Sequence, residues 1–139
     1  MKKLLVDTNI VIDLLAKREP FYDDAAKLFS LADKKKIKLS VSSLTFANTN
    51  YILQKSNPAS LAKEILRKFK ILATVLAVDD KIIDLALNDN EFVDFEDAIQ
   101  YYSAIENSQD IIITRNLKDF KTSKLPVMTA SEFIKTPKK

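Results

Sequence analysis

Four short polar segments of the chain contain residues that could bind a divalent metal ion. In chain order they are Asp7-Thr8-Asn9, Asn48, Asp94-Phe95-Glu96-Asp97, and Thr114-Arg115-Asn116 with Asp119. Carboxylate and amide oxygens are hard ligands, which suit Mg²⁺ or Mn²⁺. A metal ion held in this way can make a water nucleophilic and neutralise charge on phosphate oxygens. The residue types therefore point towards a site for Mg²⁺ or Mn²⁺.

The complete absence of histidine, cysteine and glycine excludes several other kinds of active site. Without cysteine there is no disulfide framework and no thiol nucleophile. Without histidine or cysteine, the usual zinc sites and every histidine-based triad are excluded. Without glycine, the glycine-rich loops that bind phosphate cannot form. Enzyme chemistry in this chain must therefore use carboxylates, amides, hydroxyls, Lys or Arg.

The acidic residues also have structural explanations, because Asp is a favoured N-cap of helices. Asp7 is explained equally well as the cap of the helix that follows it. We predict that Asp94 is a cap, and Asp97 could stabilise the same helix N-terminus. Asp13 and Asp84 are interpreted as solvated helix positions.

Asn48 is unusual for its place in a helical segment, because Leu44, Tyr51 and Ile52 lie one turn away. A polar group on an apolar stripe needs a hydrogen-bonding partner, since otherwise its burial costs about 1 to 3 kcal/mol. Two interpretations stay open. Asn48 either bonds to the backbone inside the core, or it belongs to a functional site.

The elements that must position these residues alternate between strands and helices. The expected strands cover residues 3–6, 37–41, 71–78, 110–114 and 126–128, and the expected helices lie around 10–16, 21–32, 43–53, 58–69, 80–87, 94–105 and 130–134. The strands are apolar throughout, as in parallel strands covered on both faces. This alternation predicts a three-layer α/β/α sandwich, formed by one domain of residues 1–139. Ligands of such sheets bind beyond the carboxyl ends of the strands, where Asp7 and Thr114 lie.

Charge and hydropathy add weaker expectations. The net charge of +3 leans towards an anionic partner, but its run Lys34-Lys35-Lys36 is interpreted mainly as a solvated turn. The apolar run 71–78 is far shorter than the roughly 18 residues of a membrane span. The segment before Asp7 is too short for the core of a signal peptide. We therefore expect a cytoplasmic protein with no membrane partner.

In their order and spacing, four blocks of sequence resemble the motifs of the PIN-domain family, and specifically those of the bacterial VapC-like ribonuclease toxins. The blocks are 5–9, 42–48, 94–100 and 114–120. The resemblance implies a five-stranded parallel sheet with strand order 3-2-1-4-5. It also implies an acidic pocket that binds Mg²⁺ or Mn²⁺, endonuclease action on RNA, a protein antitoxin and a homodimer.

Matching the motifs assigns catalytic positions one by one. Asp7 matches the first acid of the family and Asp97 the third, while Asn116 and Asp119 fall in the segment that supplies the fourth acidic or polar position. The second acid, usually Glu, is replaced by Asn48.

Two further residues receive roles. We expect Glu96 to bind the metal beside Asp7 and Asp97, so that it partly compensates for the charge missing at Asn48. Arg115 is expected to hold the RNA backbone.

Two other classes of protein share some of these sequence features. The first is a PIN-fold RNA-binding or regulatory protein without catalysis, which the replacement at Asn48 favours. The second is a receiver-type signalling domain, which needs an acidic pair after the first strand and a lone Asp after the third. Thr8-Asn9 and the pair Asp79-Asp80 fit that pattern poorly.

Overall fold

The computed structural model describes residues 1–136, so the last three residues of the predicted domain lie outside the described part. Five parallel strands form one sheet in the order β3-β2-β1-β4-β5. Their bounds are β1 Lys3–Val6, β2 Lys38–Ser42, β3 Ala73–Leu76, β4 Ile111–Ile113 and β5 Val127–Met128. This confirms the strand order that the resemblance implied.

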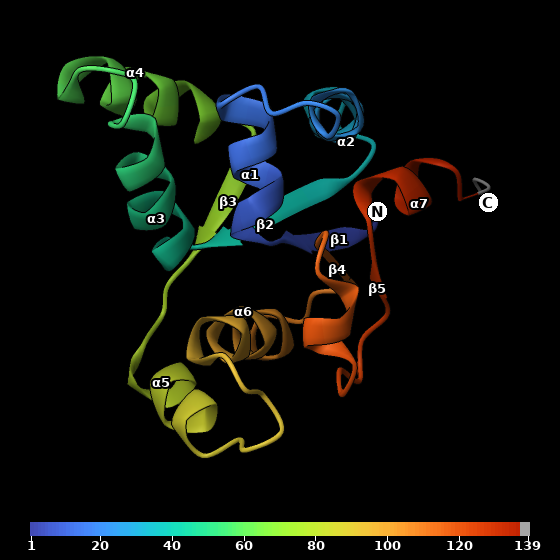
Figure 1. The fold of residues 1–139 in the computed structure, drawn as a ribbon. Helices are drawn as coiled ribbons and strands as arrows, with labels where there is room; N and C mark the ends of the chain where they lie inside the picture. The colour runs from blue at the N-terminus through green and yellow to red at the C-terminus, as the bar shows by residue number, and fades with distance from the viewer. Residues whose placement is uncertain (137–139) are drawn as a thin grey trace.

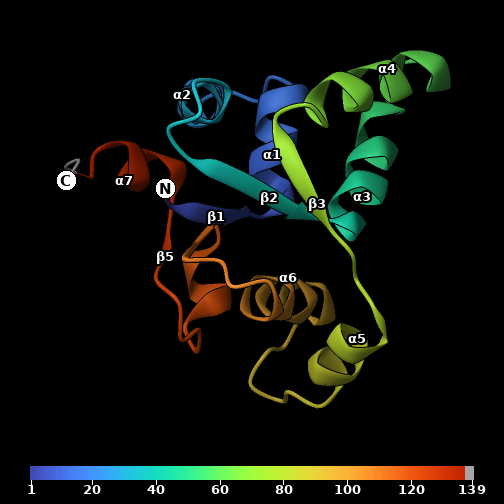
Figure 2. The same ribbon diagram turned by 180° about the vertical axis from the view of Figure 1, so that it is seen from behind.

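Helices cover both faces of the sheet. Their bounds are α1 Thr8–Leu15, α2 Tyr22–Asp33, α3 Ser43–Leu53, α4 Ala59–Phe69, α5 Asp80–Leu87, α6 Phe95–Glu106, the 3-10 helix η1 Leu117–Phe120 and α7 Ala130–Ile134. Helices α1 to α4 and α7 lie on one side, while α5 and α6 lie on the other (Figures 1 and 2). The predicted three-layer sandwich is confirmed.

The central strand β1 is buried on both of its faces, and this explains its uninterrupted apolar sequence. Leu4 and Val6 belong to the core beneath α1 and α2, whereas Leu5 points into the core beneath α5 and α6. All three side chains are fully buried. Strand β1 lies between β2 and β4, with Val6 paired to Ile113. The ends of β1 and β4 therefore lie side by side.

Aspartate side chains cap the start of three helices. Asp79 accepts a hydrogen bond from the Ile82 N–H at 3.0 Å and caps α5. Asp94 caps α6 by accepting from the N–H groups of Glu96 and Asp97 at 2.7 and 3.2 Å. The Asp94 cap was predicted. Asp7 caps α1, which begins at the next residue.

The third strand is shorter than predicted because it lies at the edge of the sheet. We expected a strand over 71–78, but β3 begins at Ala73 and Ile71 is 84% exposed. On α4, Ala62 is buried while Leu61 is 46% exposed. Edge elements have fewer neighbours, so apolar composition is a weaker guide to burial there.

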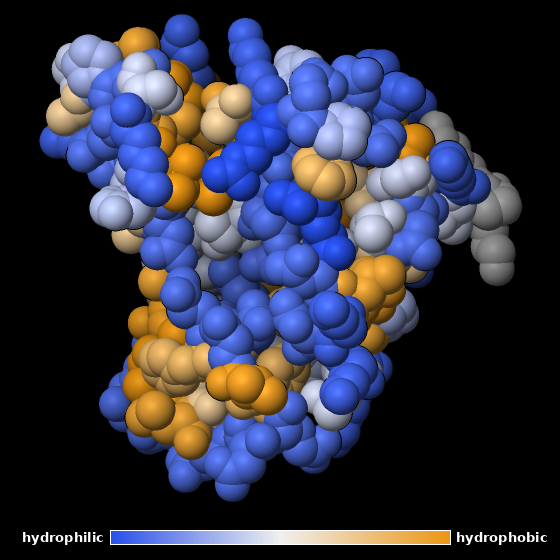
Figure 3. Space-filling model, in the orientation of Figure 1, coloured by the Kyte–Doolittle hydropathy of each residue, from blue (hydrophilic) through white to orange (hydrophobic). Residues whose placement is uncertain are grey.

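The surface alternates between polar and apolar regions. In the space-filling view, hydrophilic side chains occupy the middle of the visible face, with apolar patches above and below them (Figure 3). Among residues 1–136, no helix combines the length and apolar character needed to cross a membrane.

Candidate functional site

The candidate site lies where β1 and β4 end and α6 begins. Asp7 directly follows β1, and its N–H donates to the carbonyl of Ile113 on β4 at 2.9 Å. Thr114 directly follows β4 and is fully buried. Asp97 lies in the first turn of α6. The strand-end rule thus located Asp7 and Thr114 from sequence.

Three hydrogen bonds hold the carboxylate of Asp7, which is only 6% exposed. Its Oδ1 accepts from the Thr8 N–H at 2.8 Å, and its Oδ2 accepts from Thr114 Oγ1 at 2.8 Å and Asn9 Nδ2 at 3.2 Å. Since a carboxylate offers about four acceptor positions, about one remains for a further ligand.

The hydroxyl of Thr114 has a fixed direction. Its oxygen accepts hydrogen bonds from Asn9 Nδ2 at 3.3 Å and from the N–H of Asn116 at 3.1 Å. A hydroxyl has two acceptor positions and one proton. Because both acceptor positions are taken, the proton is directed at Asp7.

Burial, together with nearby negative charge, raises the pKa of Asp97 to about 7. Burial is the largest cause, and the carboxylates of Asp94, Asp7, Asp119 and Glu96 add to it. Burial and the charges of Asp119 and Asp94 also raise the pKa of Asp7, although the hydrogen bonds from Thr114 and Thr8 oppose the rise. Within residues 1–136, no Lys or Arg forms an ion pair with any of these five carboxylates.

Asn48 and Glu96 form a pair at this site. Asn48 Nδ2 donates to Glu96 Oε1 at 2.7 Å. The interpretation of Asn48 as a core residue bonded to backbone is wrong, because the buried side of α3 carries Thr45, Thr49 and Leu53. Asn48 itself is half-buried. The pairing links the position of the missing second acid to the extra acid of α6.

The remaining predicted positions contribute to the site to different degrees. Asp119 is exposed on η1, yet its charge acts on both Asp7 and Asp97. Asn116 is exposed and contributes its backbone N–H, to Thr114, rather than its side chain.

Asp13 was interpreted as a solvated helix position, and this is wrong. Its side chain is 0% exposed and accepts from Arg115 Nε at 2.7 Å and Nη2 at 3.2 Å. The guanidinium of Arg115 also lies over the Phe21 ring, 4.0 Å from its centroid. Arg115 therefore uses two of the N–H groups that we expected to contact RNA for hydrogen bonds within the protein.

Sequence reasoning also missed Gln100, which is 2% exposed. Its Nε2 donates to the hydroxyls of Thr8 at 3.2 Å and Thr45 at 3.1 Å, so it connects α6 to the starts of α1 and α3. The signal in the sequence was its spacing: Gln100 follows Asp97 by three residues and therefore lies on nearly the same side of the helix.

The oxygen donors of the site are of the type that Mg²⁺ and Mn²⁺ prefer. Across residues 1–136, no group of three or more acidic side chains is arranged to hold a metal ion. The predicted trio of Asp7, Glu96 and Asp97 is thus not assembled, and Glu96 is bonded to Asn48 instead. Mg²⁺, however, commonly uses one or two carboxylates and keeps several waters. Asp7 and Asp97, with hard oxygens and no paired cation, fit that mode.

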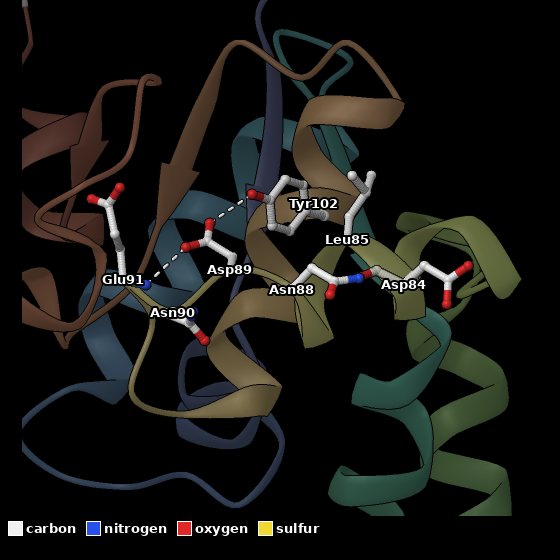
Figure 4. Close-up of a pocket in the computed structure, with 7 residues that line it drawn as sticks. All are labelled: Asp84, Leu85, Asn88, Asp89, Asn90, Glu91 and Tyr102. Carbon is white, nitrogen blue, oxygen red and sulfur yellow. Dashed lines mark hydrogen bonds between the residues drawn. The ribbon is translucent and has the colours of Figure 1, made fainter.

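A separate hollow of about 530 Å³ lies away from these residues. It is lined by Asp84, Leu85, Asn88, Asp89, Asn90, Glu91 and Tyr102 (Figure 4). The Tyr102 hydroxyl donates to Asp89 at 2.6 Å, which raises the pKa of Tyr102 to about 12 and lowers that of Asp89. Both groups keep their usual charge near neutrality, and the hydrogen bond joins α6 to the loop after α5.

Comparison with known proteins identifies the class. The PIN domain matches residues 3–118, and the chain belongs to the PIN-domain family. It is 27% identical over 135 residues to "Ribonuclease VapC1" of Aquifex aeolicus (strain VF5), covering 95% of this chain and 93% of that relative.

Solved structures share the fold. The chain resembles VapBC2 from Rickettsia felis bound to a promoter DNA fragment, with 20% identity, coverage of 91% and 96%, and a TM-score of 0.68. It also resembles DNA-bound VapBC from Salmonella typhimurium, with 19% identity, coverage of 94% and 99%, and a TM-score of 0.71. VapBC-1 from nontypeable Haemophilus influenzae gives 18% identity, coverage of 93% and 98%, and a TM-score of 0.71.

The raised pKa of Asp97 predicts a pH-dependent stability in metal-free buffer. The folded protein holds the Asp97 proton more tightly than the unfolded chain does, because the pKa rises from 3.8 to about 7 on folding. The free energy of unfolding should therefore fall as pH rises from about 4 to about 7, and then level off. Because the group is partly exposed and screened by solvent, we expect the free energy of unfolding to fall by about 1 to 2 kcal/mol. Urea unfolding at pH 5 and pH 8 measures the difference.

The control for this prediction is the comparison of two substitutions. Asp97→Asn should reduce the pH dependence and stabilise the metal-free protein at pH 8. Asp84→Asn, which changes an exposed acid of α5, should behave like the wild type. An Asp97→Asn protein that is less stable at pH 8 would show that Asp97 supports the helix and is not a strained acid.

Proposed function

We propose that this protein is a divalent-metal-dependent endoribonuclease that hydrolyses phosphodiester bonds of RNA. Asp7 and Asp97 hold the Mg²⁺ or Mn²⁺ ion. The observation that carries the proposal is a pair of carboxylates with raised pKa values, one directly after β1 and the other in the first turn of α6, without a paired Lys or Arg in the described residues. A divalent cation would offset this repulsion.

The residues of the chain have distinct tasks in this reaction. Thr114 and Asn9 orient the carboxylate of Asp7 through its Oδ2. Asp97 must be deprotonated to act as a ligand, and its pKa of about 7 allows this near neutral pH. The bound ion would supply charge neutralisation on the phosphate and a more acidic water. Asp119 adds negative charge that favours retention of the cation.

The Asn48–Glu96 pair keeps a carboxylate beside the metal position. The amide of Asn48 brings no charge, but its hydrogen bond holds Glu96 near Asp97. Successive residues of a helix point about 100° apart, so Glu96 does not share the direction of Asp97. In this proposal Glu96 would favour the bound cation through its negative charge, and Asn48 fixes where it lies.

The biological role that we propose is that of a toxin with a protein antitoxin. Support comes from the relative named Ribonuclease VapC1 and from the fold shared with proteins solved as VapBC assemblies. A cytoplasmic location and a homodimer belong to the same proposal. The competing function is an RNA-binding or regulatory protein without catalysis, and the amide at Asn48 favours it.

Cleavage assays test the proposed activity. The purified protein with Mg²⁺ or Mn²⁺ should cut RNA internally, EDTA should stop cleavage, and added Mn²⁺ should restore it. Asp7→Asn and Asp97→Asn should each lower the rate at least a hundredfold, because each removes a ligand charge from the metal. Sequencing of the 5′ ends of the products identifies the cut positions. Cleavage that persists at full rate in EDTA contradicts the metal mechanism.

Metal affinity tests the Asn48–Glu96 pair. Asn48→Glu should increase Mn²⁺ affinity about tenfold, since one more negative charge at intermediate dielectric contributes a few kcal/mol at most. Glu96→Gln should decrease it. Titration calorimetry without RNA measures both. If Asn48→Glu leaves the affinity unchanged and Asn48→Ala mainly lowers the melting temperature, the pair has only a structural role.

A further inference from the structure

Helix α1 contains a buried carboxylate, Asp13, that the proposed metal site does not use. Its side chain has no exposed surface, and burial of an unpaired charge would be costly. Arg115 provides the pairing through two N–H groups, Nε at 2.7 Å and Nη2 at 3.2 Å from the two carboxylate oxygens. This two-point geometry fixes direction as well as distance.

The other side of the guanidinium is also fixed. Arg115 lies over the ring of Phe21 at 4.0 Å, and its side chain is 27% exposed. Both residues line a hollow of about 350 Å³ together with Asp13 and Asp24. The guanidinium is therefore held at its edge by an anion and at its face by an aromatic ring.

The backbone of Arg115 connects this ion pair to the metal position. Its N–H donates to Asn9 Oδ1 at 3.3 Å. The opposite end of the same amide, Asn9 Nδ2, donates to Asp7 Oδ2 at 3.2 Å and to Thr114 Oγ1 at 3.3 Å. Every step from Asp13 to Asp7 is thus a direct contact.

We propose that Asp13 and Arg115 are positioning residues, whose ion pair fixes the segment 114–116 against α1 so that Thr114 and Asn9 hold Asp7 in a metal-binding orientation. This inference rests on the proposed nuclease function. It gives Arg115 a task inside the protein in place of the predicted contact with the RNA backbone.

Steady-state kinetics with Mn²⁺ and RNA provide the first test, on Asp13→Asn, Arg115→Gln and the double variant. Each single change should lower kcat about tenfold and leave KM and its salt dependence unchanged. The double variant should be no slower than either single, because residues that act through one contact are not additive. Glu106→Gln is the matched control, since it removes the acid of the Lys81–Glu106 pair, remote from the site.

Hydrogen exchange of the metal-free protein provides the second test, which does not depend on activity. In Asp13→Asn the amides of Arg115 and Asn116 should exchange at least tenfold faster. The Asp7 amide, which bonds to the β4 backbone, should keep its protection. An equal loss of protection at all three amides would mean general destabilisation and would overturn the proposal. Arg115→Lys serves in the same way if Asp13→Asn does not fold.

The outcomes separate this inference from the proposed function. If the wild type cuts no RNA, the nuclease proposal fails, while the exchange pattern still decides whether the pair positions the segment. In the opposite outcome, Arg115→Gln raises KM and reduces by about one the number of counterions released on RNA binding. If Asp13→Asn then has a normal kcat, Arg115 contacts RNA. That result would overturn the positioning role.

Discussion

Repulsion among carboxylates at the carboxyl edge of the sheet is the constraint on which the site depends. Two like charges roughly 6 Å apart repel by about 3 kcal/mol at the effective dielectric of a protein surface. A typical hydrogen bond contributes about 1 kcal/mol net, so the three bonds to Asp7 are of a size to offset one such repulsion. In the metal-free protein, burial and neighbouring negative charge raise the pKa of Asp7 and of Asp97, and a divalent cation would favour the ionised form of both.

The fold supplies the rigidity that keeps these acids together. Strands β1 and β4 are adjacent and buried, and they place Asp7 beside Thr114. On α6, the Asp94 cap accepts from the Asp97 N–H and so fixes the first turn. Gln100 connects that helix to the starts of α1 and α3. Local caps and a shared polar network hold charges that would otherwise move apart.

Much of this architecture could be predicted from the sequence, because the central strands β1 and β4 are buried apolar runs and helices such as α5 and α6 begin at a capping acid. The expectation of a site at Asp7 followed from the rule about strand ends. The Asp13–Arg115 pair could not be predicted, since residues 102 apart meet only through the packing of α1 against β4. Asp13 was misjudged for a simple reason: an acid in a short helix is usually solvated. The exposed edge of β3 at Ile71 likewise depends on its neighbours and not on its composition.

Proton release on metal binding is the most direct test of the central claim. Because Asp97 has a pKa of about 7, it carries about half a proton at pH 7, which a cation must displace. Calorimetric titration with Mn²⁺ at pH 7, in buffers of different ionisation enthalpy, should show the release of about half a proton per ion. At pH 8.5 the release should be near zero, and in Asp97→Asn it should be largely lost at both values. Tight binding without proton release at pH 7, or no binding at all, would contradict a metal site built on strained carboxylates.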